Sequence, residues 1–356
     1  MKRFDIILLA TVVSLTFFGL FMIYNASSFI AFRDFGDKYH YIKDQSLWIV
    51  LGFGALFVSS FFDYRLFRFL ALPLLILAII LLILVFVPGF GIYALGAKRW
   101  INAGLFVLQP AEFVKLSLAI YLSAWFSNKE KGRFLPFALL LGLVIFLVML
   151  EPDMGTAFII FSEAIVVYFL SGAKLLHFFV ALPIVAVGSL LLIKFEPYRA
   201  QRLLSFFNSL SSINSVSYHV KQILIALGSG GIAGVGLGNS LQKYAYLPEN
   251  TTDSIFAIIA EEVGFIGATI LILLLLVIVW RGFIIASGAR DTFGKLLAGS
   301  ITSFLAVQMI INLGSQTALL PLTGVPLPFI SYGGSALVVD LCAIGILLNI
   351  SRSSSV

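Results

Sequence analysis

Long runs of apolar residues recur along the whole chain and limit how it can fold. The first run, residues 6–23, contains no charged side chain. An α-helix needs about 20 apolar residues to cross the hydrocarbon core of a bilayer. Because no water reaches that core, the backbone there must form its own hydrogen bonds, and a helix does so within one segment. The sequence therefore predicts an all-α integral membrane protein.

Ten segments are predicted to be transmembrane helices. The composition fits a membrane protein, since 60% of the 356 residues are hydrophobic and 11% are charged, whereas about a quarter of a soluble domain is charged. The single cysteine, Cys342, lies in an apolar run, which excludes a disulfide within the chain and a cysteine metal site. We predict one polytopic domain over residues 1–356, with spans near residues 6–30, 46–62, 66–88, 110–126, 135–150, 156–171, 174–194, 254–280, 293–317 and 334–350 and a large loop at 195–252.

Basic residues indicate the orientation of these spans. Loops that carry Lys and Arg stay in the cytoplasm, so the net charge of +6 is an orientation signal and not a nucleic-acid surface. An even number of spans then puts both termini in the cytoplasm and the long loops 32–45, 89–109 and 195–252 outside. Within the last loop, the amphipathic segment 218–227 is too short to span and is predicted to be an interfacial or re-entrant helix.

A polar segment, residues 109–115, opens the fourth predicted span. Pro110 suits the first helical turn, where a missing N–H costs nothing. Glu112 and Lys115 lie three residues apart on one helix face and can form an ion pair. Charged side chains at this depth usually face a cavity or a partner, which favours a functional role. Arg99, in the preceding loop, is equally consistent with anchoring at the membrane interface.

Two carboxylates flank Pro152. Glu151 and Asp153 could bind a cation or a basic side chain. Asp153 could instead cap the sixth helix, because an acidic side chain accepts the free N–H groups of a first turn. The pattern favours the cap for Asp153 and leaves both alternatives open for Glu151.

The largest gathering of polar groups lies at residues 227–267. Six glycines between 228 and 238 follow no predicted strand, which excludes a dinucleotide-binding unit, although their N–H groups could hold phosphate. Asp253 starts the eighth span, where it could be an N-cap or an active group. Glu261 and Glu262 lie about 12–14 Å deeper along that helix, so we interpret them as cavity lining or structural support.

A proline-rich segment, residues 321–337, precedes the tenth span. Its three prolines prevent a regular helix, while Gly333 and Gly334 permit a sharp turn back into the membrane. Irregular backbone at the membrane edge needs protein around it or a cavity beside it. We therefore expect the bundle to shield this segment. Asp340, inside the span that follows, is a further intramembrane acid.

These motifs together resemble those of the SEDS proteins (shape, elongation, division and sporulation), the integral membrane family that contains RodA, FtsW and SpoVE. The likeness covers essentially the whole chain, and GLGNS followed by QK and YLPE is more similar to the FtsW branch than to RodA. Asn250-Thr251 stands where the family usually has Ala-His, residues 209–217 lack its proline-aspartate-glycine connection, and Ala318 replaces a glycine. The shared segments are KRWI (98–101), QPAEFVK (109–115), EPDMGTA (151–157), GSGGIAGVGLGNSLQKYAYLPENTTD (228–253), IIAEEVGFIG (258–267) and TGVPLPFISYGGSA (323–336).

The resemblance implies a peptidoglycan glycosyltransferase of the bacterial cytoplasmic (inner) membrane. Such a protein polymerises lipid II into glycan strands on the outer face, for division or elongation, together with a class B penicillin-binding protein that acts as transpeptidase. Asp253 matches the family's essential aspartate and would take the proton of the acceptor sugar hydroxyl. The expected outcome is a single displacement that inverts the anomeric carbon.

The lipid-diphosphate leaving group develops negative charge and needs cationic groups near it. The resemblance makes Arg99, Lys115 and Lys243 candidates, and a divalent cation, Mg²⁺ or Mn²⁺, could assist. Glu112 would then orient Lys115. The expected substrate-binding residues are Arg99, Glu112, Lys115, Gln242, Lys243 and Glu249.

A lipid II flippase and a scaffold for division proteins are the alternatives. Many helices and an intramembrane polar cavity would also suit transport. Transport sites, however, usually lie near the bilayer midplane, whereas the carboxylates of Asp253 and Glu151 are predicted at the outer end of the spans. Their position favours an enzyme.

Overall fold

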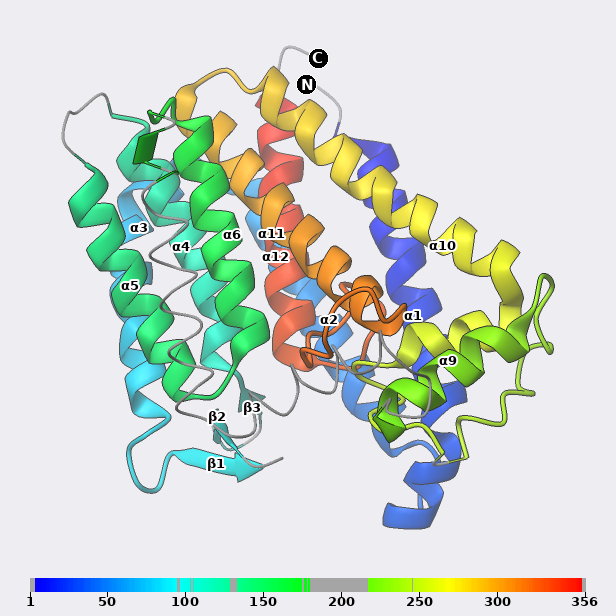
Figure 1. Ribbon diagram of the computed structural model, residues 1–356. Coiled ribbons are helices and arrows are strands. Elements are labelled where there is room, and N and C mark those ends of the chain that lie inside the picture. Colours follow the sequence, from blue (N-terminus) through cyan, green and yellow to red (C-terminus); the bar gives the residue numbers. More distant parts are fainter. Residues whose placement is uncertain are drawn as a thin grey trace.

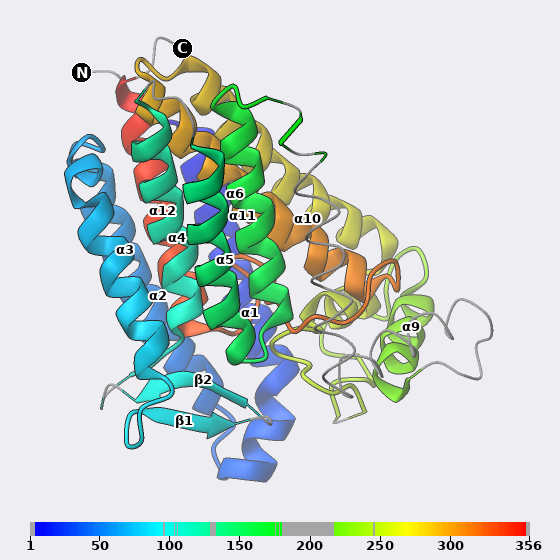
Figure 2. The same ribbon diagram turned by 60° about the vertical axis from the view of Figure 1, so that its left-hand side comes forward.

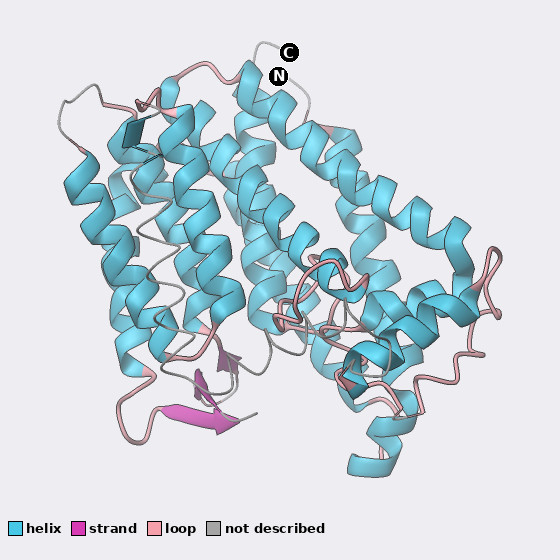
Figure 3. Ribbon diagram, viewed as in Figure 1, coloured by secondary structure: helices cyan, strands magenta, loops and turns pink. Residues whose placement is uncertain are grey.

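A computed structural model describes residues 4–94, 97–102, 104, 106–128, 133–174, 176–177, 179, 217–244 and 246–353. Within these residues the chain forms ten helices and one small sheet, and most helices run side by side in a bundle (Figure 1). Helix predominates throughout this part of the chain (Figure 3). The helices are α1 (Ile6–Phe35), α2 (His40–Phe61), α3 (Leu66–Leu84), α4 (Pro110–Phe126), α5 (Phe134–Leu150), α6 (Met154–Leu170), α9 (Tyr218–Gly230), α10 (Ile255–Gly288), α11 (Thr292–Gln316) and α12 (Gly334–Ser353).

The observed helices lie where spans are predicted. α4 has the predicted bounds, and α5 and α6 differ from them by one or two residues. α1 and α10 are longer than predicted, at 30 and 34 residues. α9 covers the predicted interfacial segment and continues to Gly230. The predicted span 174–194 falls almost entirely outside the described residues, as does the first part of the loop 195–252.

Six of the described helices, α1, α2, α3, α10, α11 and α12, are long and apolar enough to cross a membrane, and α5 and α6 are shorter apolar helices. α11 and α12 form the centre of the bundle (Figures 1 and 2). In each of them 78% of the apolar segment is buried inside the protein, against 22% in α3 at the edge. The chain is therefore a helical, multi-pass membrane protein, as predicted.

A three-stranded antiparallel sheet interrupts the helical pattern between α3 and α4. Its strands are β1 (Gly91–Ala94), β2 (Ala97–Asn102) and β3 (Val107–Leu108), in the order β1-β2-β3. The sequence analysis assigned this stretch to a loop, and that was wrong. Strands of two to six residues give too short an alternation to distinguish from a loop. The sheet holds β2, and with it Arg99, across the end of the bundle (Figure 2).

Small residues allow α2 and α12 to pack closely. A Cβ added to Gly345 would lie 1.9 Å from Ser59 Oγ and 2.4 Å from Leu56 O, and one added to Gly334 would lie 2.1 Å from the Trp48 ring. The Ser59 hydroxyl donates to Cys342 O at 3.0 Å. In lipid, where burial of apolar surface does not drive helices together, such packing and hydrogen bonds hold them.

Both described chain ends lie at one end of the bundle, which we call the terminal end (Figure 1). Asp5 accepts a hydrogen bond from Leu8 N at 3.0 Å, which caps α1. It also forms an ion pair with Arg281 of α10 at 2.6 Å, and its N–H donates to Ser351 Oγ of α12 at 3.3 Å. The sheet and α9 lie at the opposite end, which we call the loop end (Figures 1 and 2).

Replacing Gly345 by Ala should destabilise the protein. The new Cβ would meet the backbone oxygen of Leu56 at 2.4 Å, so α2 and α12 must move apart, and overpacking of this kind costs about 1–3 kcal/mol. Thermal unfolding in detergent measures the effect. Gly54→Ala, on α2, is the matched control, because a Cβ there meets nothing within 4 Å. Equal unfolding temperatures for the two variants would contradict the close approach of α2 and α12.

Candidate active site

The proline-rich segment between α11 and α12 lies at the loop end and has no helix over residues 317–333. Side chains of α11 satisfy its backbone: Gln308 Nε2 donates to Pro326 O at 3.1 Å, and Asn312 Nδ2 donates to Val325 O at 2.7 Å. Tyr332 N donates to Thr251 O at 2.9 Å. The protein therefore shields this irregular segment, as expected, and ties it to the chain that enters α10.

Two polar segments that are far apart in sequence both pack against residues 323–325. A Cβ added to Gly155 would lie 2.4 Å from Val325 Cγ2 and 3.1 Å from Thr323 O. Gly324, with φ +76°, lies beside Asp253, because a Cβ added there would be 3.3 Å from Asp253 Oδ2. The loop 151–155 and the Asp253 carboxylate are thus neighbours of one turn. We call this arrangement the candidate active site.

Asp253 precedes α10 without being its N-cap. The helix begins at Ile255, and its N-cap is Ser254, whose side chain makes no capping hydrogen bond. The capping alternative for Asp253 is therefore wrong, because the helix starts one residue later than that alternative requires. The backbone carbonyl of Asp253 accepts from Asn312 Nδ2 at 3.1 Å. α11 therefore fixes the position of this half-buried residue.

Arg99 reaches the candidate active site from β2. Its Nε donates to Glu151 O at 2.9 Å, and its Nη2 donates to Pro152 O at 2.5 Å. The residue is partly exposed. Both bonds are to main-chain oxygens, so the guanidinium keeps its charge unpaired by these contacts and has donors left over. Its place on the loop 151–155 favours the site assignment over simple anchoring at the interface.

Asp153 caps α6, as predicted. Its carboxylate accepts from Thr156 N at 3.0 Å and from Thr156 Oγ1 at 2.9 Å. The same carboxylate accepts from Gln109 Nε2 at 3.1 Å, and Gln109 N donates to Ser335 Oγ at 3.1 Å. Asp153 therefore joins the first turns of α4, α6 and α12 beneath the candidate active site.

Glu151 is fully buried, and neither carboxyl oxygen has a hydrogen-bond partner among the described residues. Burial, assisted by the nearby charge of Asp153 and opposed by Arg99, raises the pKa of Glu151 to about 9. The group is therefore neutral at physiological pH. The sequence analysis left open whether Glu151 binds a basic side chain. Arg99 does contact Glu151, but through the backbone carbonyl and not through the carboxyl group.

Lys115 and Glu112 form the predicted ion pair within α4, at 2.6 Å. Lys115 Nζ also donates to Gln308 Oε1 at 2.7 Å, and the side chain is 0% exposed. Its ammonium is thus closed off from any ligand in this structure. This differs from the expectation that Lys115 contacts a diphosphate directly, because α11 and α12 cover α4 at this depth.

α10 is broken at Gly264, which has φ 68° and ψ −171° inside the helix. A glycine loop, residues 231–244, fills the break. Val235 N donates to Glu261 O and Gly236 N to Glu262 O, both at 3.0 Å, while Phe265 N and Ile266 N donate to the carbonyls of Gly231 and Ile232 at 2.9 and 3.2 Å. The sequence predicted an uninterrupted span here, and the break is a correction. Only glycine tolerates such backbone angles.

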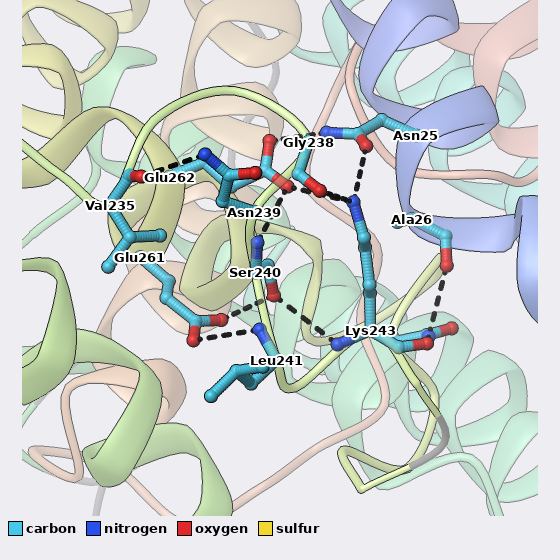
Figure 4. A network of polar contacts seen from close by, with 11 residues as sticks. Asn25, Ala26, Val235, Gly238, Asn239, Ser240, Leu241, Lys243, Glu261 and Glu262 are labelled. Carbon is cyan, nitrogen blue, oxygen red and sulfur yellow. Dashed lines mark hydrogen bonds and ion pairs between the residues drawn. The ribbon is translucent and has the colours of Figure 1, made fainter.

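Side chains reinforce this joint from the loop and from α1 (Figure 4). Lys243 Nζ donates to Asn25 Oδ1 at 2.9 Å and to Gly238 O at 2.5 Å, and lies 3.4 Å from Glu262 Oε1. Asn25 donates to Glu262, and Ser240 donates to Glu261. Glu261 and Glu262 therefore have the supporting role that was inferred for them. Lys243 is 6% exposed and belongs to the same supporting network. Its ammonium is therefore not accessible to a diphosphate, which differs from the expectation for this residue.

Two other predicted substrate-binding residues flank this joint. Gln242 is 8% exposed, and its Oε1 has no partner among the described residues. Glu249 is exposed, and its Oε2 accepts from Thr252 Oγ1 at 3.0 Å. Glu249 therefore lies one turn before Asp253 and faces the solvent side of the candidate active site.

Some groups of interest escaped the sequence analysis. The Thr323 hydroxyl is buried without a partner among the described residues, in the turn beside Asp253. Glu163 is buried in α6, and a lone acid inside an apolar run was the available signal. In the part of the chain that the structure describes, no group of three or more His, Cys, Asp or Glu side chains could hold a metal ion.

Fold and site together define a multi-pass helical membrane protein with a carboxylate and a guanidinium brought together at one end of its bundle. The chain belongs to the family of cell cycle proteins that comprises FtsW, RodA and SpoVE, whose sequence profile matches residues 6–356. This confirms the family inferred from the motifs.

Relatives of known name match almost the whole chain. Stage V sporulation protein E of Bacillus subtilis is 39% identical, over 98% of this chain and 97% of that protein. The probable peptidoglycan glycosyltransferase FtsW of Geobacter sulfurreducens is 38% identical, over 98% of this chain and 95% of that protein.

Two solved structures share the fold. A chain in a peptidoglycan synthase complex, described for its coordination of polymerization and crosslinking, has a TM-score of 0.80 and 27% identity over 98% of both chains. The rod shape determining protein RodA of Thermus thermophilus has a TM-score of 0.73 and 26% identity, over 99% of this chain and 98% of that one. The higher identity to FtsW and SpoVE agrees with the placement nearer FtsW than RodA.

Replacing Glu151 by Gln should change how stability depends on pH. The folded protein keeps the Glu151 proton up to its pKa of about 9, while the unfolded chain releases it above 4.5. The stability that this carboxyl contributes is thus complete below the lower pKa and is lost as the pH rises toward the higher one. The unfolding temperature of Glu151→Gln should therefore increase relative to that of the wild type as the pH rises. Glu249→Gln, at an exposed position, should show no such gain, and a constant difference for Glu151→Gln would contradict the assignment.

Replacing Gly234 by Ala should loosen the joint in α10. Gly234 has φ +82°, and an added Cβ would lie 2.1 Å from Glu262 O. The strained backbone alone costs about 1–3 kcal/mol, so hydrogen–deuterium exchange should rise at Val235, Phe265 and Ile266. Gly228→Ala, in neighbouring α9, meets nothing within 4 Å and is the control. Unchanged exchange in Gly234→Ala would show that the loop does not close the break.

Proposed function

We propose that this protein is a peptidoglycan glycosyltransferase that polymerises lipid II into glycan strands. Relatives that carry this activity in their names are similar over almost the whole chain. The observation that carries the proposal for this chain is the meeting of Asp253 with the Arg99-bound loop 151–155 on either side of residues 323–325. One group there can accept a proton, and the other can stabilise an anion.

The proposed reaction is a single displacement. The acceptor sugar hydroxyl gives its proton to the Asp253 carboxylate while its oxygen forms a bond to the anomeric carbon of the donor. The bond between that carbon and the diphosphate oxygen breaks, and its electron pair leaves with the lipid diphosphate. The anomeric carbon is inverted, the glycan is one unit longer, and Asp253 carries the proton that it then releases to water.

Arg99 is the cation that we assign to the leaving group. It is partly exposed at the candidate active site and spends two donors on carbonyl oxygens, whereas Lys115 and Lys243 are buried in ion pairs. A planar guanidinium also matches the geometry of phosphate oxygens. Lys115 with Glu112, and Lys243 with Glu262, support the elements around the site. Gln242 and Glu249 remain proposed neighbours of the substrate.

We place the loop end outside the cytoplasmic membrane and both termini in the cytoplasm. This is supported by the basic residues near the terminal end, since cytoplasmic loops are rich in Lys and Arg. Those that the structure describes there include Arg65, Arg68, Arg133, Arg281, Lys295 and Arg352. A class B penicillin-binding protein is the proposed partner, supported by the likeness to a chain of a peptidoglycan synthase complex.

The test is polymerisation of lipid II by the purified full-length protein, alone and with its partner transpeptidase. Asp253→Asn should lower the rate about 10²–10⁴-fold, the range for loss of a general base, and should unfold at the wild-type temperature. Asp37→Asn, at a partly exposed acid in the turn between α1 and α2 that pairs with Lys43, should polymerise normally. Normal activity of Asp253→Asn would remove the proposed base. Movement of labelled lipid II across liposome membranes, without formation of any polymer, would instead support the flippase function.

A further inference from the structure

Four ionisable side chains lie inside the bundle, on helices that begin at the candidate active site. They come from α4, α6 and α12: Glu112, Lys115, Glu163 and Asp340, which are 3%, 0%, 0% and 1% exposed. Lys115 interacts electrostatically with all three acids, most strongly with Glu112 and then with Asp340 and Glu163. Three buried acids therefore share one buried base.

Lys115 already has two partners. Lys115 forms an ion pair with Glu112 at 2.6 Å and donates to Gln308 Oε1 at 2.7 Å. Glu163 Oε1 accepts from Ser300 at 2.8 Å, but Glu163 Oε2 and both carboxyl oxygens of Asp340 have no hydrogen-bond partner among the described residues. A buried carboxylate without partners is strongly disfavoured, because nothing replaces its lost hydration.

Among the described residues, no other charge on the surrounding helices compensates these two acids. On α10, Glu261 and Glu262 hold the glycine loop and Arg281 pairs with Asp5. On α2, Lys43 pairs with Asp37 and Asp44 accepts from Tyr332, and both lie at the loop end. The remaining described charges of the packed helices, Arg33, Asp34, Arg68, Lys295 and Arg352, lie at helix ends.

The cluster also lacks the ligand set of a metal site. No group of three or more acid, His or Cys side chains in the described residues could hold a metal ion. Full ionisation would thus leave two uncompensated negative charges inside the membrane part of the bundle, which is too costly to persist. A proton on each acid removes both charges and needs no ligand geometry.

We propose that Asp340 and Glu163 form an intramembrane proton-binding site that holds two protons at mildly acidic pH, where exposed acids are already ionised. The inference is independent of the glycosyl transfer proposed above. It has a structural consequence for α4: a negative charge on Asp340 would compete with Glu112 for Lys115. Lys115 lies six residues, about 9 Å along the helix, from Gln109, which contacts Asp153 at the candidate active site. The protons therefore preserve the Glu112–Lys115 ion pair in the first turns of α4.

Infrared spectroscopy of the full-length protein in lipid nanodiscs tests the proposal at mildly acidic pH. The carbonyl stretch of a protonated carboxylic acid is separate from the carboxylate bands. Asp340→Asn and Glu163→Gln should each remove one carboxylic acid from that band, and the double variant should remove two. Asp37→Asn, which removes a partly exposed carboxylate paired with Lys43, should leave the band unchanged. An unchanged band in both single variants would overturn the proposal.

A second measurement does not depend on the variants folding. Labelling the aspartate carboxyl groups of the wild-type protein with carbon-13 shifts the infrared bands of aspartate side chains and leaves those of glutamate side chains in place. At mildly acidic pH we expect a shifted carboxylic acid band from buried Asp340, and its proton should exchange slowly in D₂O. The absence of any shifted carboxylic acid band would show that Asp340 is ionised and would overturn the proposal for that residue.

Discussion

Backbone groups in an apolar surrounding must find their hydrogen bonds inside the protein, and the loop end of this bundle is arranged around that requirement. Where α10 breaks at Gly264, the main chain of the glycine loop takes over the missing bonds. Where residues 317–333 leave the helical path, side chains of α11 bind the carbonyls of Val325 and Pro326. Both interruptions flank Asp253, so the bonds that permit irregular backbone also position the candidate active site.

The sequence was sufficient for features that depend on local chemistry. Pro110 at the first helical turn and Asp153 at an N-cap predicted where α4 and α6 begin. The spacing of Glu112 and Lys115 predicted their ion pair. Three prolines predicted the non-helical approach to α12. Each of these results follows from residues within one or two turns of each other, where spacing determines which groups can touch.

Features that depend on distant segments could not be predicted in the same way. No local pattern places Gly155 and Asp253 on either side of residues 323–325. The burial of Lys115 depends on α11 and α12, and that of Lys243 depends on Asn25 of α1. The break in α10 was not predicted because Gly264 lies in a long helical segment whose only charged residues nearby are Glu261 and Glu262, and a single glycine in such a segment is compatible with a straight helix.

The joint at Gly264 has a consequence for how this surface can change in evolution. Its principal bonds run between main-chain atoms, so they survive replacement of the side chains around them. Ile232, Leu237 and Leu241, which are 73%, 57% and 67% exposed, can therefore vary without altering the path of the loop. The backbone angles require the glycines, whereas the exposed apolar side chains between them can be replaced by others. A rigid main-chain scaffold with interchangeable tips lets related proteins acquire new neighbours in the membrane while the geometry at Asp253 stays the same.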